Sequence, residues 1–179
     1  EGQLKGSEDC LTLNIRRPME GKDLPVLVWI HGGGYNTGSA SVPLYSGVSF
    51  AEKGIVFVSV QYRLNVLGFY DFTTYPGCED FESNCGVSDQ ILAITWIHEN
   101  IKAFGGDPGR ITIAGESAGG ASVVNMLAAP AVKGMFSQAI AQSPLPNCIG
   151  HPQDSRREYM ICFWKAWGGT WGICRSSER

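Results

Sequence analysis

Several features that would assign a class of protein at once are missing from this sequence. No apolar stretch approaches the roughly 20 residues of a membrane-spanning helix, so no membrane segment is predicted. No long basic run is present and the net charge is −3, which argues against nucleic-acid binding. With 179 residues, 44% of them hydrophobic and only 17% charged, the chain is predicted to be globular, with one domain built on its own core.

Metal-binding and glycosylation patterns are also missing. The cysteines form no CxxC pair with histidines nearby, so neither a metal site nor a cofactor is predicted. They are expected to be either buried thiols or disulfides, and the sequence leaves both open. There is no Asn-x-Ser/Thr site, which is a weak argument against a secreted eukaryotic protein. The first residue is Glu1 and not an initiator Met, so the chain is expected to be a mature form or a piece of a longer protein. The six cysteines are Cys10, Cys78, Cys85, Cys148, Cys162 and Cys174.

Strand patterns and helix patterns alternate along the chain. Residues 24–30 are almost continuously apolar, as in a strand buried on both faces, and residues 10–18 alternate as in a half-exposed strand. Between residues 88 and 105 apolar side chains recur at helical spacing, and Gly105 is placed to end the helix. This alternation predicts an α/β fold with a mostly parallel sheet covered on both faces. Further strands are predicted at 54–64, 110–115 and 136–143, and a second helix from Ser117 to Pro130.

The stretch ITIAGESAGG, residues 111–120, encloses a serine between glycines. The pattern Gly-x-Ser-x-Gly is common by chance, but here a predicted strand precedes it and a predicted helix follows it, as in a nucleophile elbow. Gly115 and Gly119 are required there because larger side chains would collide with the backbone around so sharp a turn. The pattern predicts that Ser117 is a nucleophile, held on a strained turn at a helix N-terminus.

A second glycine-rich element lies upstream of the serine. His31 and three glycines directly follow the buried strand 24–30, where an α/β-hydrolase places the loop that binds the oxyanion. Backbone N–H groups of glycines approach a ligand without obstruction, and losing one such donor typically costs about 2.7–4 kcal/mol of transition-state stabilisation. His31 is predicted to hold this loop rather than to act as a base.

Together these stretches resemble the type-B carboxylesterases, the group that includes cholinesterases and bacterial para-nitrobenzyl esterases. EDCLTLNI at 8–15 and FGGDPGRITIAGESAG at 104–119 are similar to the two signatures of that family, and the likeness runs roughly from residue 7 to 147. The resemblance implies the α/β-hydrolase fold and hydrolysis of a small-molecule carboxylic ester through an acyl-enzyme. The overall likeness to the bacterial members favours the cytoplasm, and the oligomeric state is left open.

The resemblance also implies individual roles around the serine. Ser117 would be the nucleophile, and Gly33, Gly34 and Ala118 would supply the N–H groups of the oxyanion hole. Glu116 would be a buried acid beside the serine that tunes the site.

Three further residues match family positions outside the site. Arg63 and Asp89 correspond to a buried ion pair. Cys10 corresponds to a cysteine that in many members bridges to one upstream, before Glu1. Cys85 departs from the family pattern, which has tyrosine or valine at its position.

The histidine and acid of a catalytic triad are not found where the family requires them. A serine esterase needs both, and in α/β-hydrolases they follow the serine along the chain. Only His151 follows Ser117, in a segment without family likeness, and His98 has the setting of a packing residue. The chain is therefore expected to be the N-terminal part of such an enzyme, with a sheet incomplete at the C-terminus. Residues 1–150 would belong to the hydrolase domain, and residues 151–179 would be a tail without a clear match.

Other functions stay open beside the serine esterase. One is a truncated family member without turnover, since the triad is incomplete. Another is a non-catalytic adhesion protein of the same fold, although those relatives have typically lost the serine that Ser117 supplies here. A thioesterase or amidase would use the same nucleophile chemistry.

Overall fold

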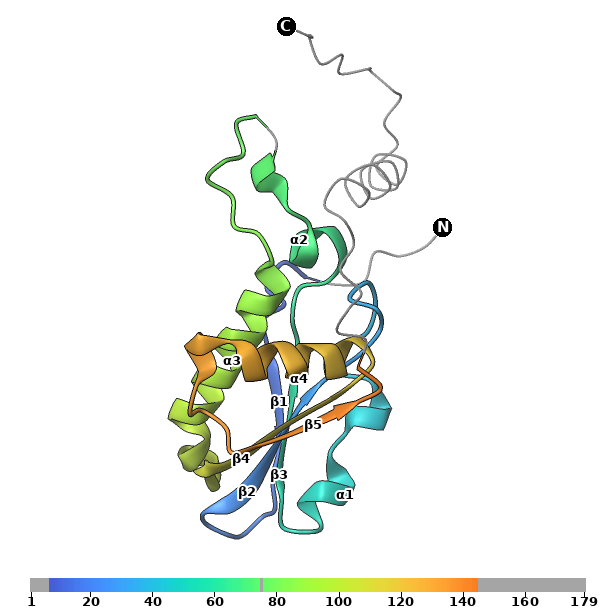
Figure 1. Cartoon of the computed structure of the whole chain (residues 1–179). Coiled ribbons are helices and arrows are strands. Elements are labelled where there is room, and N and C mark those ends of the chain that lie inside the picture. The colour runs from blue at the N-terminus through green and yellow to red at the C-terminus, as the bar shows by residue number, and fades with distance from the viewer. Residues whose placement is uncertain (1–6, 75, 145–179) are drawn as a thin grey trace, which may run out of the picture. The chain divides into compact units, whose positions relative to one another are not determined.

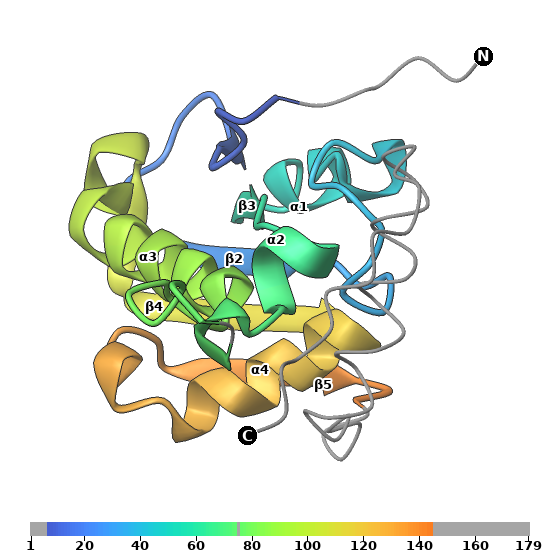
Figure 2. The same ribbon diagram turned by 90° about the horizontal axis from the view of Figure 1, so that it is seen from above.

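Five strands form a single mixed sheet in the computed structural model, which describes residues 7–74 and 76–144 (Figure 1). Their order is β1-β3-β2-β4-β5; β1 runs antiparallel to β3, and the other neighbours are parallel. Figure 2 shows the succession of β3, β2, β4 and β5 from above. The predicted mostly parallel sheet is therefore confirmed. The strands are β1 (Leu13–Arg16), β2 (Leu24–Ile30), β3 (Val56–Val60), β4 (Gly106–Glu116) and β5 (Gln138–Gln142).

Helices cover both sides of the sheet. The long helices α3 (Cys85–Asn100) and α4 (Ala118–Ala128) lie on one side, and the short α1 (Val48–Ala51) lies on the other (Figure 1). The remaining helix, α2 (Asn65–Phe69), packs against α3. Single turns of 3-10 helix occur at η1 (Pro43–Tyr45), η2 (Phe72–Thr74), η3 (Ile101–Phe104) and η4 (Pro130–Val132).

The core lies between the sheet and the two long helices. Every residue of β3 is buried, and Ile94 and Ile97 of α3 pack with Val123 and Met126 of α4 in the same cluster. β2 is buried or half-buried at every position, so it needs successive apolar residues, and its apolar run could be recognised from the sequence. The core fixes β2 and β4 side by side, so that their carboxyl ends meet at one edge of the sheet.

Several element boundaries differ from the predicted ones. The strand expected from residue 10 begins only at Leu13, because Cys10 and Thr12 use their N–H groups in local turn bonds to the carbonyls of Glu8 and Cys10. The helix expected at 88–105 starts three residues earlier and narrows to 3-10 in its last turn before Gly105, which has φ +83°. The short helices α1 and α2 were not predicted, because a single turn leaves no periodicity to detect.

Arg63 and Asp89 form the predicted ion pair. Arg63 Nη2 donates to Asp89 Oδ1 at 2.7 Å, and its Nε donates to Oδ2 at 2.8 Å. The backbone N–H of Arg63 also donates to Oδ2 at 3.0 Å. The pair is buried on one side only, since the side chain of Asp89 is 3% exposed and that of Arg63 is 36% exposed. The hydrogen bond to Asp89 raises the pKa of Arg63 above its usual value, so the guanidinium stays charged throughout the ordinary pH range.

Asp89→Asn is expected to lower the free energy of unfolding by about 2–3 kcal/mol. The amide has the shape of the carboxylate, but its NH₂ group donates hydrogen bonds and cannot accept them. At least one of the three hydrogen bonds from Arg63 is therefore lost, and a buried amide N–H faces another donor. Urea denaturation of the variant and of Asp80→Asn, which removes an exposed carboxylate from the same region, measures the difference. Equal stability of the two variants would contradict a structural role for the pair.

Candidate active site

Ser117 lies between the end of β4 and the start of α4, as predicted. Its backbone has φ +56° and ψ −119°, a conformation that costs a non-glycine residue about 1–3 kcal/mol and occurs mostly at functional sites. Hydrogen bonds hold it on both sides: its N–H donates to Gln142 O at 2.9 Å, and its carbonyl accepts from Ala121 N–H at 2.9 Å. The hydrogen bonds to β5 and α4 together hold Ser117 in this strained backbone conformation, which directs its side chain away from both the sheet and the helix.

Glycine is required at the positions around Ser117 because neighbouring backbone atoms pass too close to allow a side chain. A Cβ on Gly115 would lie 2.4 Å from the carbonyl group of Gly119, and a Cβ on Gly119 would lie 2.1 Å from the carbonyl oxygen of Ile30. A Cβ on Gly120 would lie 2.5 Å from Gln142 O. These are the collisions expected from the sequence, and they show that α4 leaves the sheet in direct contact with β2 and β5.

The glycine loop that follows β2 lies directly against the serine turn. A Cβ placed on Gly32 would be 2.6 Å from Glu116 O and 3.3 Å from Ser117 Cβ. The next two glycines have φ +112° and φ +62°, so the loop bends sharply away from the strand. The N–H groups of Asn36 and Thr37 both donate to Gly33 O at 3.1 Å, which closes the loop on itself. The structure thus brings together the two motifs that were separated by more than 80 residues in the sequence.

His31 fixes the start of this loop. Its ring is 1% exposed and stacks on Tyr62 with centroids 4.5 Å apart, and its Nδ1 lies 2.8 Å from Gly32 O. The hydroxyl of Tyr62 donates to His31 O at 2.7 Å. Burial lowers the pKa of His31, partly offset by the contact with Gly32, so the ring is neutral near pH 7. These contacts agree with a holding role, and the sequence had not singled out Tyr62.

Tyr35 anchors the other end of the loop and was also missed. It has φ +61°, its carbonyl accepts from Asn65 N–H at 2.7 Å, and its ring packs on Phe69 at 4.5 Å. Its hydroxyl lies 3.3 Å from Oγ of Ser122, on the helix that starts at the serine turn. The only sequence signal was the position of Tyr35 directly after the third glycine, which does not reveal these partners.

Among the described residues the side chain of Glu116 is exposed, and the burial that the family resemblance implies for it stays a prediction. Glu116 is the last residue of β4, so it stands at the carboxyl end of the sheet. Its Oε2 lies over the glycine loop, 3.2 Å from the position of a Cβ on Gly32. Its role in tuning the site stays a prediction.

Of the two remaining histidines considered in the sequence, one lies in the described part of the chain and one lies outside it. His98 is half-buried on α3, with Nδ1 3.2 Å from Met135 O, which fits the packing role expected for it. His151 and the segment 151–179 lie outside the described residues, so the domain boundary at 150 stays a prediction. In residues 7–74 and 76–144, no three His, Cys, Asp or Glu side chains are grouped to hold a metal ion, and no helix is both long and apolar enough to cross a membrane.

Comparison with known proteins places this arrangement in a family. The family model described as "Carboxylesterase family" matches residues 1–167. The chain belongs to the carboxylesterase family. It is 47% identical over 139 residues to a para-nitrobenzyl esterase of Bacillus subtilis (strain 168), a match that covers 76% of this chain and 28% of the relative. It is 44% identical over 155 residues to a cholinesterase of Mus musculus, covering 84% of this chain and 25% of the relative.

Solved structures give the same result for the fold. A structure titled "PNB esterase" superimposes with a TM-score of 0.76 and 38% identity, covering 90% of this chain and 34% of the other. The fold is therefore that of the α/β hydrolases, of which this carboxylesterase chain carries the N-terminal part. The chain spans about a quarter to a third of the length of the relatives it matches.

Proposed function

We propose that this chain carries the nucleophile and the oxyanion-binding loop of a serine esterase that cleaves carboxylic esters of small molecules. The contact between Gly32 and Ser117 supports this proposal most directly, because it sets a loop rich in unobstructed N–H groups beside a serine on a strained turn. The names of the relatives, para-nitrobenzyl esterase and liver carboxylesterase among them, favour an ester as the substrate.

The proposed mechanism is acyl transfer. Ser117 Oγ attacks the ester carbonyl carbon while a base takes its proton, and the carbonyl oxygen becomes an oxyanion. The N–H groups of Gly33, Gly34 and Ala118 donate hydrogen bonds to that oxygen. The alcohol then leaves with a proton, and water hydrolyses the acyl-enzyme by the same steps. The base and its acid are proposed to come from the downstream part that relatives have beyond the length of this chain.

Two alternatives remain beside this proposal. A chain that never acquires a base would be a folded but inactive member, because a protonated hydroxyl is a weak nucleophile. A non-catalytic adhesion protein would have no use for a strained Ser117, which is why the esterase is favoured. The cytoplasmic location stays a prediction.

An alkyl fluorophosphonate tests the proposal by phosphonylating activated serines. With the downstream part restored, the protein is expected to take up one equivalent, and mass spectrometry should locate the adduct on the peptide that contains Ser117. Labelling should be lost after heat denaturation. Adducts on several serines, or none on this peptide, would remove the support for a nucleophile here.

Gly33→Ala is expected to lower kcat for a short-chain nitrophenyl ester by about 10²-fold, a loss comparable to that of one oxyanion donor. Its Cβ would lie 2.2 Å from Thr37 O at a φ of +112°, so the loop must shift. Gly54→Ala is the matched control, since Gly54 lies outside the site, a Cβ there has open space, and its φ of +79° also lies in the left-handed region. Equal activity of the two variants would contradict an oxyanion role for the loop.

A further inference from the structure

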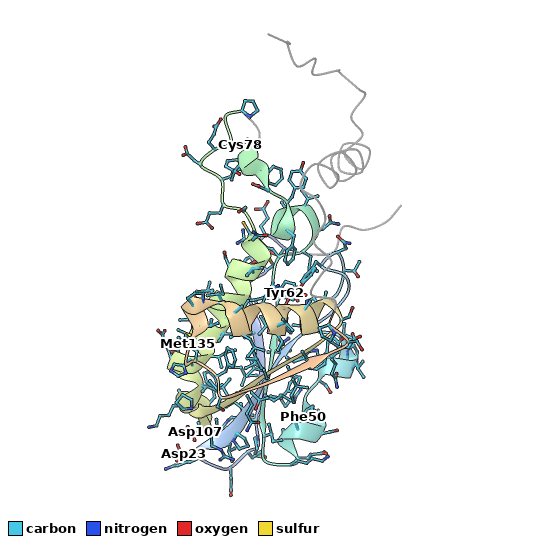
Figure 3. The ribbon with its side chains drawn as sticks, in the orientation of Figure 1. Asp23, Phe50, Tyr62, Cys78, Asp107 and Met135 are labelled. Atoms are coloured by element: carbon cyan, nitrogen blue, oxygen red, sulfur yellow. The ribbon has the colours of Figure 1, made fainter. Side chains whose placement is uncertain are left out.

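Hydrogen bonds hold three successive carbonyl groups at the start of the glycine loop. The hydroxyl of Tyr62, which lies at the end of the sheet that faces α2 (Figure 3), donates to His31 O at 2.7 Å. The ring nitrogen Nδ1 of His31 lies 2.8 Å from Gly32 O. Two backbone N–H groups further along the loop donate to Gly33 O at 3.1 Å. The direction of each of these carbonyl groups is therefore fixed.

A fixed carbonyl group also fixes the N–H group of the next residue. The two groups share one planar peptide and point in opposite directions when the bond is trans, and the described residues contain no cis peptide bond. Gly32 O shares its peptide with the N–H of Gly33, and Gly33 O shares its peptide with the N–H of Gly34. The second of these peptides is held by the backbone of the loop, whereas the first depends on the side chain of His31.

The contact with Gly32 O also determines which nitrogen of His31 carries the proton. A carbonyl oxygen only accepts hydrogen bonds, so Nδ1 is the protonated nitrogen. Burial lowers the pKa of His31, so the ring is neutral and Nε2 has no proton. Nε2 is buried and has no hydrogen-bond partner among the described residues. The opposite tautomer would set two lone pairs against each other at Nδ1 and leave an N–H without an acceptor at Nε2.

The hydrogen bond between His31 and Gly32 is enclosed by protein. The ring stacks on Tyr62 and is 1% exposed. A Cβ on Gly38 would lie 2.5 Å from His31 Nδ1 and 2.6 Å from Gly32 O, so the backbone of Gly38 covers both atoms of the bond. Because water does not reach these atoms, it does not compete for the carbonyl, and the bond is stronger than an exposed one.

We propose that His31 is a positioning residue of the esterase site, whose Nδ1–H holds the carbonyl of Gly32 and thereby aims the N–H of Gly33 at the oxyanion. This inference rests on the proposed function and assigns one proton of His31 to one donor of the oxyanion hole. Glycine on both sides of the peptide permits either orientation of its plane, so the hydrogen bond selects one of them. His31 itself touches no substrate and transfers no proton.

Two substitutions of equal shape isolate this hydrogen bond. His31→Leu and His31→Asn both lose the ring that stacks on Tyr62, but the asparagine Nδ2–H occupies the place of the histidine Nδ1–H. With the downstream part restored, His31→Leu is expected to lower kcat for a short-chain nitrophenyl ester by about 10²-fold, with KM changed by less than about threefold, because a misplaced donor acts on the transition state. His31→Asn should return kcat to within about fivefold of the parent.

His98→Leu is the matched control. His98 is a half-buried histidine outside the site, and its Nδ1 also lies near a backbone carbonyl, 3.2 Å from Met135 O. This variant should keep kcat within about twofold of the parent. Both His31 variants should still take up one equivalent of the fluorophosphonate, at a lower rate in His31→Leu, which shows that the serine turn remains folded.

Nitrogen NMR of the histidine-labelled parent gives a measurement that does not depend on the folding of His31→Leu. The signals that disappear in His31→Asn are expected to be those of a neutral ring protonated at Nδ1. A ring protonated at Nε2, or equal kcat in the leucine and asparagine variants, would overturn this inference alone. A parent whose Ser117 is not labelled would remove the proposed function, and this inference with it.

Discussion

Ser117→Ala is expected to lower kcat/KM for a short-chain nitrophenyl ester by at least about 10⁴-fold in a version of the protein with its downstream part restored. Alanine removes the hydroxyl oxygen that is proposed to attack the ester, and the acyl-enzyme can no longer form. The backbone should be unaffected, because the hydrogen bonds that hold the turn use the N–H and the carbonyl of residue 117. The loss should therefore appear in kcat, with an unchanged urea midpoint.

The matched control is Ser88→Ala, which removes an exposed hydroxyl from α3 and should leave kcat/KM within twofold of the parent, a range of about 0.4 kcal/mol. Fluorophosphonate labelling provides the second measurement. It should be absent in Ser117→Ala and complete in Ser88→Ala. If Ser117→Ala keeps a tenth of the parent activity or more, the chemistry belongs to another residue and the proposed mechanism fails.

The 179-residue chain should behave differently in the same assay. Oxyanion stabilisation alone leaves a residual enhancement of about 10³–10⁴ over water when the triad of an otherwise intact enzyme fails. All five residues of β5 are exposed here, and β5 stands at the edge of the described sheet, where an unpaired strand favours association between chains. Aggregation is therefore expected to limit the chain before slow catalysis is measurable. Monomeric protein with ordinary esterase turnover would contradict this expectation.

Local patterns predicted the parts of the fold that depend on local chemistry. The apolar run 24–30 predicted β2 with the correct ends, because a strand that is buried or half-buried at every position allows no polar interruption. The glycines at 115 and 119 predicted a crowded turn, because only the absence of a side chain lets backbone pass so closely. In both cases the cause lies within a few residues of the effect.

What sequence reasoning missed depends on contacts across the chain. Tyr35 meets Ser122 only because the glycine loop and α4 converge at the carboxyl end of the sheet. The likeness to the family implies burial for Glu116, which stays a prediction because the described residues alone leave it exposed at that end. Whether a residue at the end of the sheet is buried depends on the segments that pack against that end. The hydrophobic periodicity of the strand itself does not reveal those segments.

Gly119→Ala is expected to destabilise the protein by at least about 3 kcal/mol, against the direction of helix propensity. Gly119 is the second residue of α4, and in an exposed helix the change to alanine stabilises by roughly 1 kcal/mol. Here the new Cβ would lie 2.1 Å from Ile30 O and 2.9 Å from both the carbonyl carbon and the carbonyl oxygen of His31. All three atoms are backbone, so no rotamer change relieves the overlap, and α4 must move away from β2.

The displacement should also reach the site, because the backbone that α4 would push is that of His31, from which the glycine loop starts. Urea denaturation measures the stability, and fluorophosphonate labelling of the restored protein reports the site. Gly109→Ala is the control: its Cβ would meet only Oδ1 of Asp107 at 3.3 Å, and that carboxylate already bonds the N–H of residue 109 at 2.8 Å. This variant should stay within about 1 kcal/mol of the parent. If Gly119→Ala is as stable as Gly109→Ala, the close contact between α4 and β2 is wrong, and with it the packing that sets the glycine loop beside Ser117.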